Sequence, residues 1–181
     1  MRIIAGKYRG RKLETPSDMD VRPTTDKMRE RIFSMVQHAR YPALHGAQVM
    51  DVFAGTGALG LEALSRGAAH VTFVEKSPKS IALLNKNIAL MKVEQDTTLI
   101  KSRATSLQAA TAPCDFIFMD PPYGRNLLVP SIACLLEGGW LASDGVIIAE
   151  MKSDEAFEVP AGLTLIDDRK QGIQRVVFMG K

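Results

Sequence analysis

The chain has 181 residues, of which 46% are hydrophobic and 24% charged, and its formal net charge is +3. This length suits one well-cored domain rather than two, and the composition excludes intrinsic disorder, a collagen-like repeat and a coiled coil. No apolar run approaches the roughly 20 residues of a membrane span, and no apolar signal core indicates secretion. The two cysteines are too few for a disulfide scaffold or a metal cluster, so we expect a cytoplasmic protein without a metal.

The charge is unevenly divided along the chain. Residues 1–50 hold ten Lys and Arg against five Asp and Glu, whereas residues 51–181 hold thirteen against fifteen. The first twelve residues contain no acid and five cations, which are Arg2, Lys7, Arg9, Arg11 and Lys12. This asymmetry favours a polyanionic partner, although a basic terminus that is merely solvated would look the same.

Residues 1–45 are expected to contain a β-hairpin followed by a helix. Residues 2–16 alternate and turn around Gly6 and Gly10, which predicts a short β-hairpin. Pro23 then breaks the extended run, and Thr24 or Thr25 is a suitable cap for a helix. The apolar stripe of that helix consists of Met28, Ile32, Met35 and Val36. We expect residues 1–45 to form a basic extension that faces its partner.

From residue 46 onward, predicted strands alternate with predicted helices. Strands are expected over 47–53, 70–75, 97–101, 114–120 and 145–151, and helices over 57–67, 78–91 and 127–139. Residues 163–180 read as two strands around a turn, which predicts an antiparallel hairpin. The alternation predicts an α/β domain over 46–181, with a mostly parallel sheet covered on both faces.

A glycine-rich loop follows the first strand of this domain. Gly55, Gly57 and Gly60 satisfy the spacing G-x-G-x-x-G, and Glu75 ends the next strand twenty residues after Gly55. Glycines permit a tight turn and the close approach of a ligand to the backbone, while an acid at the second strand's end is placed to hold ribose hydroxyls. The pattern predicts a nucleotide-binding loop.

Asp51 distinguishes between two ligands of such a loop. A dinucleotide would bring its pyrophosphate close to this carboxylate, which would repel it. S-adenosylmethionine instead brings an ammonium and a sulfonium group, which the carboxylate attracts. The short chain also leaves little room for the substrate domain of a dehydrogenase. S-adenosylmethionine is therefore the cofactor that the sequence favours.

A second loop, Asp120–Tyr123, follows the fourth predicted strand with the sequence DPPY. If the first and fourth strands are neighbours, both loops line one crevice at the carboxyl ends of the strands. Hydrogen bonds accepted by the Asp120 side chain and the Pro121 carbonyl would make an exocyclic amine more tetrahedral and aim its lone pair at the methyl group. Tyr123 would stack on the planar base. The pattern predicts an amino methyltransferase that acts on a base.

These motifs together resemble a class I S-adenosylmethionine-dependent methyltransferase. The segments MRIIAGKYRGRKL, VRPTTDKMRERIFSMV and DVFAGTGALGLEALSRGA resemble the RsmD family, over almost the whole chain. Members of that family methylate the N2 amine of one guanine in 16S ribosomal RNA on the assembled small subunit. The resemblance implies a seven-stranded Rossmann-like methyltransferase fold, that substrate and S-adenosylmethionine as the cofactor.

The resemblance also assigns roles by position. The implied catalytic residues, which hold the guanine, are Asp120, Pro121, Pro122 and Tyr123. The implied cofactor-binding residues are Asp51, Phe53, Ala54, Gly55, Thr56, Gly57, Glu75, Lys76, Arg103 and Ala104. The implied RNA contacts are Arg2, Lys7, Arg9, Arg11, Lys12, Arg22 and Thr24. The segment Ser102–Ala104 lacks the acid that such enzymes often place near the adenine, so backbone groups or Arg103 would read the adenine instead.

Two alternatives stay open at this stage. DPPY also occurs in DNA adenine-N6 methyltransferases, although this chain has no room for the DNA-recognition domain that they usually carry. A non-catalytic RNA-binding factor for ribosome assembly could also keep the fold, although Asp51, Glu75 and DPPY argue against it. We expect the protein to act as a monomer.

Overall fold

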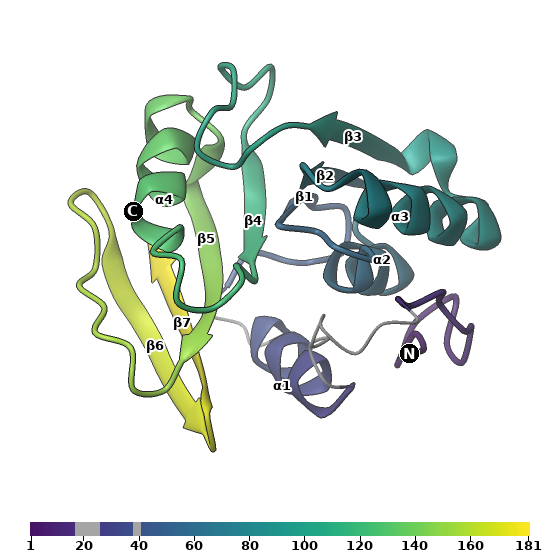
Figure 1. The fold of residues 1–181 in the computed structure, drawn as a ribbon, viewed down its shortest axis with the longest axis horizontal. Helices are drawn as coiled ribbons and strands as arrows, with labels where there is room; N and C mark the ends of the chain where they lie inside the picture. Colours follow the sequence, from purple (N-terminus) through teal and green to yellow (C-terminus); the bar gives the residue numbers. More distant parts are fainter. Residues whose placement is uncertain (17–25, 38–40) are drawn as a thin grey trace.

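The computed structural model describes residues 1–16, 26–37 and 41–181, and it contains a seven-stranded sheet with helices on both faces (Figure 1). The strands are β1 (Gln48–Val52), β2 (His70–Glu75), β3 (Thr97–Lys101), β4 (Cys114–Met119), β5 (Leu141–Lys152), β6 (Thr164–Gln171) and β7 (Gln174–Gly180). The helices are α1 (Asp26–Val36), α2 (Ala58–Ser65), α3 (Pro78–Met91) and α4 (Leu128–Glu137), and a 3₁₀ helix (Glu94–Asp96) precedes β3.

The strand order is β3-β2-β1-β4-β5-β7-β6. Strands β1 to β5 are parallel, and β7 runs antiparallel to both β5 and β6. This arrangement confirms the predicted α/β class, the mostly parallel sheet and the antiparallel C-terminal hairpin. The order reverses between β1 and β4, which are paired, so the loops that follow these two strands lie side by side at one edge of the sheet.

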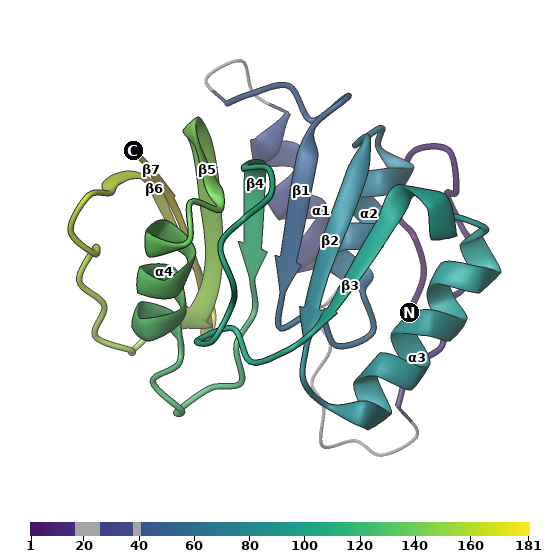
Figure 2. The ribbon, with the colours of Figure 1, turned by 90° about the horizontal axis from the view of Figure 1, so that it is seen from above.

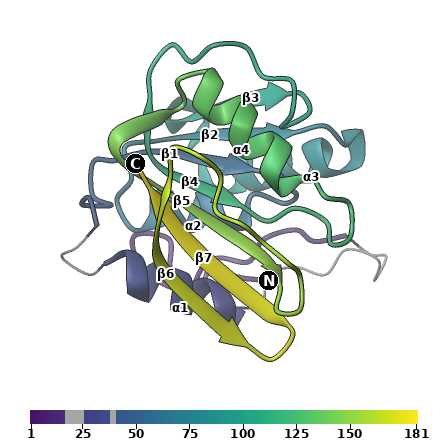
Figure 3. The ribbon, with the colours of Figure 1, turned by 90° about the vertical axis from the view of Figure 1, so that its left-hand side faces the viewer.

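Alternate residues of the strands point to opposite faces of the sheet and belong to two hydrophobic clusters, one on each face. Helices α1, α2 and α3 pack on one face, whereas α4 packs on the other (Figures 1 and 2). Figure 3 shows the β6–β7 hairpin extending the sheet beyond β5, between α4 and α1. Within the described ranges, no helix is long and apolar enough to cross a membrane.

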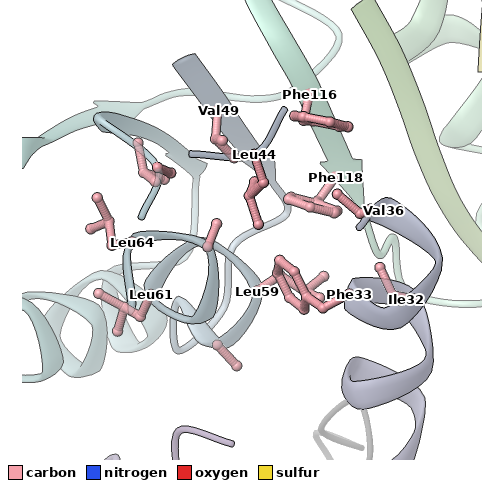
Figure 4. Packing of buried hydrophobic residues seen from close by; sticks show 14 of the residues in the cluster. Ile32, Phe33, Val36, Leu44, Val49, Leu59, Leu61, Leu64, Phe116 and Phe118 are labelled. Carbon is pink, nitrogen blue, oxygen red and sulfur yellow. The ribbon is translucent and has the colours of Figure 1, made fainter. Parts of the chain in front are cut away.

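Helix α1 is part of the core that supports the sheet. Its fully buried Phe33 lies against Phe118 of β4, with ring centroids 5.3 Å apart, and Leu59 of α2 lies beside it (Figure 4). Ile3 and Leu13 of the N-terminal segment belong to the same cluster. The described part of residues 1–45 thus shares one hydrophobic core with residues 46–181.

The N-terminal arm, residues 1–16, differs from the predicted hairpin. Its antiparallel pairing is short, with one bridge between Arg2 and Lys12 and three backbone hydrogen bonds across the arm, and no regular strand forms. The neighbouring amides of the arm point to α2 and bind its side chains. The buried Glu62 accepts hydrogen bonds from the amides of Ile4 at 2.8 Å and Ala5 at 3.0 Å.

Contacts with Ser65, at the end of α2, complete this attachment. The Ser65 hydroxyl donates to the Ala5 carbonyl at 2.5 Å and accepts from the Tyr8 amide at 3.0 Å. Between them Gly6 has a φ of +81°, and a Cβ there would lie 1.8 Å from the Ser65 carbonyl oxygen. Only glycine allows the arm to approach the helix this closely.

Glu62→Ala should destabilise the protein by about 3 kcal/mol, because it leaves two arm amides and the Arg66 guanidinium, 2.8 Å from Glu62, without their acceptor. Glu62→Gln keeps an acceptor oxygen and should lose less. Urea unfolding measures both, with the exposed Glu94→Ala as the control. Equal stability of Glu62→Ala and the control would show that the arm is not held by this carboxylate.

Candidate functional site

A cavity of about 600 Å³ opens at the carboxyl ends of the parallel strands. Its walls come from the loops after β1, β2, β3 and β4, from the ends of β5 and β7, and from both ends of the arm. This volume lies within the range of pockets that hold a small-molecule ligand. The position agrees with the rule that ligands of open α/β sheets bind where the strand order reverses.

The loop after β1 includes positions in the left-handed region of the backbone, which residues other than glycine rarely adopt. Phe53 has a φ of 64° and Gly55 a φ of 55°. A bulky residue in the left-handed region is strained, and such strain is characteristic of ligand-binding loops. The loop is fixed from β2, because the Ala54 amide donates to the Val74 carbonyl at 3.1 Å and the Gly55 amide donates to Glu75 Oε2 at 2.8 Å.

The Glu75 carboxylate binds backbone amides of two loops, the one after β1 and the one after β2. Besides the Gly55 amide, its carboxylate accepts from the amides of Lys76 and Ser77, each at 2.8 Å from Oε1. A carboxylate offers about four acceptor positions, so three protein donors leave one for a ligand hydroxyl. Glu75 therefore shapes the loop and still has capacity to bind.

Asp51 is almost completely buried beneath the loop and at the start of α2. Its Oδ2 accepts the Gly60 amide at 2.8 Å, which satisfies one of the free donors of the helix N-terminus. Burial raises the pKa of Asp51 well above its usual range, the Gly60 hydrogen bond opposes that shift, and the Asp120 and Glu75 carboxylates add to it. A buried carboxyl with two further carboxylates close by forms a site suited to a cationic group.

Most of the residues assigned to the cofactor and the base meet at this cavity. Those that line it are Asp51, Phe53, Ala54, Gly55, Thr56, Glu75, Lys76, Arg103, Ala104, Asp120, Pro121, Pro122 and Tyr123. Gly57 is not among the lining residues. It has a φ of +82°, and a Cβ there would lie 2.4 Å from Leu84 Cδ1 of α3, so the close packing of the loop on α3 also requires glycine.

The five cations of the arm are exposed at the surface. Arg11 donates from Nη1 to the Leu90 carbonyl at the end of α3, and Arg2 lies 3.8 Å from Asp26. Within the described ranges, Arg9 and Lys12 make no ion pair. The remaining two residues predicted to contact RNA, Arg22 and Thr24, lie outside the described residues.

Asn87 of α3 connects the arm to the glycine loop. This fully buried side chain accepts from the Glu14 amide at 2.7 Å, donates to the Glu14 carbonyl at 3.1 Å, and donates to the Thr56 carbonyl at 2.9 Å. Met1 and Pro16, at the two ends of the arm, line the cavity. The basic arm therefore borders the cavity.

Sequence reasoning missed several lining residues. The sequence motifs assign no role to Glu150, Ser77, Ser80, Leu127 or Gln174, although all five line the cavity. Glu150 carried a usable signal, because an acid close to the end of a buried parallel strand lies at the ligand edge. Gln174 carried none, since its position depends on the antiparallel pairing of β7 with β5.

Comparisons with known proteins agree with this geometry. The family described as "Conserved hypothetical protein 95" matches residues 1–180. Ribosomal RNA small subunit methyltransferase D of Escherichia coli (strain K12) is 38% identical over 173 residues, which cover 95% of this chain and 85% of that protein. The Haemophilus influenzae protein of the same name is 35% identical over 178 residues, covering 96% and 90%.

A solved structure shows the same fold. The Escherichia coli protein yhhF superposes with a TM-score of 0.86 at 38% sequence identity, over 99% of this chain and 96% of that chain. The fold is thus the Rossmann-like fold of class I methyltransferases, with DPPY and the glycine loop at one cavity. The chain is a methyltransferase and belongs to the family of ribosomal RNA small subunit methyltransferase D.

Proposed function

We propose that the protein methylates the N2 amine of a guanine in the 16S ribosomal RNA of the small subunit, with S-adenosylmethionine as the methyl donor. The observation that carries this proposal is that one cavity joins the acid-lined glycine loop to the Asp120–Tyr123 loop, beside a basic arm. The name of the relatives, ribosomal RNA small subunit methyltransferase D, supports the substrate. The proposal places the protein in the cytoplasm, as a monomer.

The residues present fit S-adenosylmethionine. In this proposal Asp51 binds its cationic end, Glu75 the ribose hydroxyls, and the backbone around Arg103 and Ala104 the adenine, and all four residues line the cavity. When bound, this cofactor supplies an electrophilic methyl group. The acids of the cavity attract its positive charge and would repel a pyrophosphate, so the cavity favours S-adenosylmethionine over a dinucleotide, as Asp51 indicates in the sequence.

The Asp120–Tyr123 loop would hold the guanine. The Asp120 carboxylate and the Pro121 carbonyl accept the two N–H groups of the N2 amine, which withdraws the nitrogen lone pair from the ring and aims it into the cavity. Two prolines stiffen the backbone between Asp120 and Tyr123, and the Tyr123 ring stacks on the base. Catalysis by these residues is positioning, with no covalent intermediate on the protein.

The arm would bind the phosphates that flank the target. Its exposed cations, Arg2, Lys7, Arg9, Arg11 and Lys12, extend from the rim of the cavity. Lys7 Nζ lies 5.1 Å and Arg11 Cζ 5.9 Å from the centroid of the Tyr8 ring, so the ring attracts both cations to one place on the arm. On this view residues 1–45 are the RNA-facing part and residues 46–181 the catalytic part.

Methyl transfer is tested with labelled cofactor and small ribosomal subunits that lack the modification. The expected product is N2-methylguanosine in 16S ribosomal RNA, identified by mass spectrometry after digestion. Asp120→Ala should lower kcat by about 10²–10³-fold, because an acceptor that positions the amine is lost, while cofactor affinity should fall much less because Asp51 and Glu75 remain. Naked 16S RNA and duplex DNA serve as competing substrates. Methylation of adenine in DNA, or no methyl transfer to guanine N2, would overturn the proposal.

Cofactor affinity should rise with pH through the range in which Asp51 ionises. Burial raises the pKa of Asp51, so at low pH the carboxyl is neutral and binding of a cation must release its proton. The affinity should change by up to about tenfold per pH unit in that range. Calorimetry in buffers of different ionisation enthalpy measures the released proton. Asp51→Asn keeps an acceptor for the Gly60 amide and should flatten the profile, whereas an equal pH dependence in this variant would assign it to another group.

Replacing Arg9 and Lys12 by Ser should weaken RNA binding and reduce its salt dependence by about two units of slope, since each lost phosphate contact removes roughly one. These two cations make no ion pair within the described ranges, so the fold should be unaffected. Filter binding across a salt series measures the slope. The control replaces Arg169 and Lys170, exposed on β6 at the sheet's opposite edge. An equal loss in both variants would show an effect of net charge alone.

A further inference from the structure

Glu150, near the end of β5, collects hydrogen bonds from two other parts of the sheet. Its Oε1 accepts the Tyr123 hydroxyl at 2.8 Å and the Gln174 side-chain amide at 2.6 Å. Glu150 is 4% exposed and Gln174 7% exposed, and all three residues line the cavity. The loop after β4, strand β5 and strand β7 are therefore joined at one carboxylate oxygen.

The Gln174 contact follows from the sheet register. Glu150 of β5 is paired with Val176 of β7, so Gln174, two residues earlier on β7, is its diagonal neighbour on the same face. Gln174 thus fixes the Glu150 carboxylate from a position that the sheet itself determines.

Stacking alone does not explain this arrangement. An aromatic ring that only stacks on a base needs no hydroxyl, and a buried carboxylate is costly unless hydrogen bonds compensate for its burial. The hydrogen bond from the Tyr123 hydroxyl to Glu150 Oε1 is 2.8 Å long and directional, so it restricts the angle of the ring. Pro121 and Pro122 already limit the backbone that leads to Tyr123. The ring is then held at both ends.

We propose that Glu150 is a positioning residue, which holds the Tyr123 ring in the orientation that the target base requires for methyl transfer, and that Gln174 holds Glu150. The identity of the base rests on the proposed function. The tether between Glu150 and Tyr123 does not, and it can be measured without turnover.

The tether is tested by fluorine NMR on protein labelled with 3-fluorotyrosine. The chain has three tyrosines, so Tyr123→Phe assigns the Tyr123 resonance. Glu150→Ala should shift and broaden this resonance and leave those of Tyr8 and Tyr41 in place. Glu150→Gln retains an acceptor oxygen and should restore it. A Tyr123 resonance that is the same in wild type and Glu150→Ala would overturn the tether.

The consequence for catalysis is tested by a double-mutant cycle with small subunits as substrate. Tyr123→Phe and Glu150→Ala should each lower kcat by about tenfold or more, and the double variant should be no worse than the poorer single variant. KM should change less because the stacking ring remains. Glu150→Gln should recover most of kcat, and cofactor affinity should be unchanged throughout. Additive losses, or no rescue by Glu150→Gln, would overturn the positioning role.

The two experiments separate this inference from the proposed function. If the wild type methylates guanine and kcat is equal in all variants, the positioning role is wrong and the function stands. If the Tyr123 resonance responds to Glu150→Ala but the wild type transfers no methyl group to RNA, the tether stands and the proposed function is wrong.

Discussion

The parallel pairing of β1 with β4 is the constraint on which the rest of the site depends. The register places Val52 opposite Met119, so the chain leaves both strands at the same level of the sheet. Two loops that are more than sixty residues apart in sequence then line one cavity. The hydrophobic packing of α1, α2 and α3 on one face and α4 on the other supports this pairing, because both central strands are buried on both sides.

Acids at the strand ends have two uses in this architecture. Asp51 accepts an amide from the first turns of α2, and Glu75 accepts three amides around the glycine loop, so both shape the loop before any ligand binds. Burial raises the pKa of Asp51, and the carboxylates of Asp120 and Glu75 lie close enough to add to that rise. A cationic ligand would relieve that repulsion, whereas the five exposed cations of the arm lie outside the cavity lining. The separation of charge noted in the sequence therefore corresponds to a separation in space.

The fold was largely predictable, because strands and helices alternate with clear hydrophobic periods. The acids of the cavity could be recognised because Asp51, Glu75 and Asp120 lie at or next to the ends of strands. The glycine loop, Glu75 and Asp120–Tyr123 could be recognised for the same reason. The hairpin predicted for the arm is present only as a short antiparallel pairing without regular strands. The attachment of the arm to Glu62 and Ser65 could not be predicted, because it depends on tertiary structure. The contact of Glu150 with Gln174 could not be predicted, because it depends on the register of two strands that are distant in sequence. The packing of Gly57 against Leu84 likewise depends on tertiary structure.

A crystal structure of the protein with S-adenosylhomocysteine would test the central claim most directly, that one cavity binds the methyl donor between the glycine loop and the Asp120–Tyr123 loop. We expect the amino-acid end beside Asp51 and Gly55, a ribose hydroxyl on the remaining acceptor position of Glu75, and the sulfur facing Asp120. A ligand bound outside this cavity, or one whose ribose lies away from Glu75, would contradict the account.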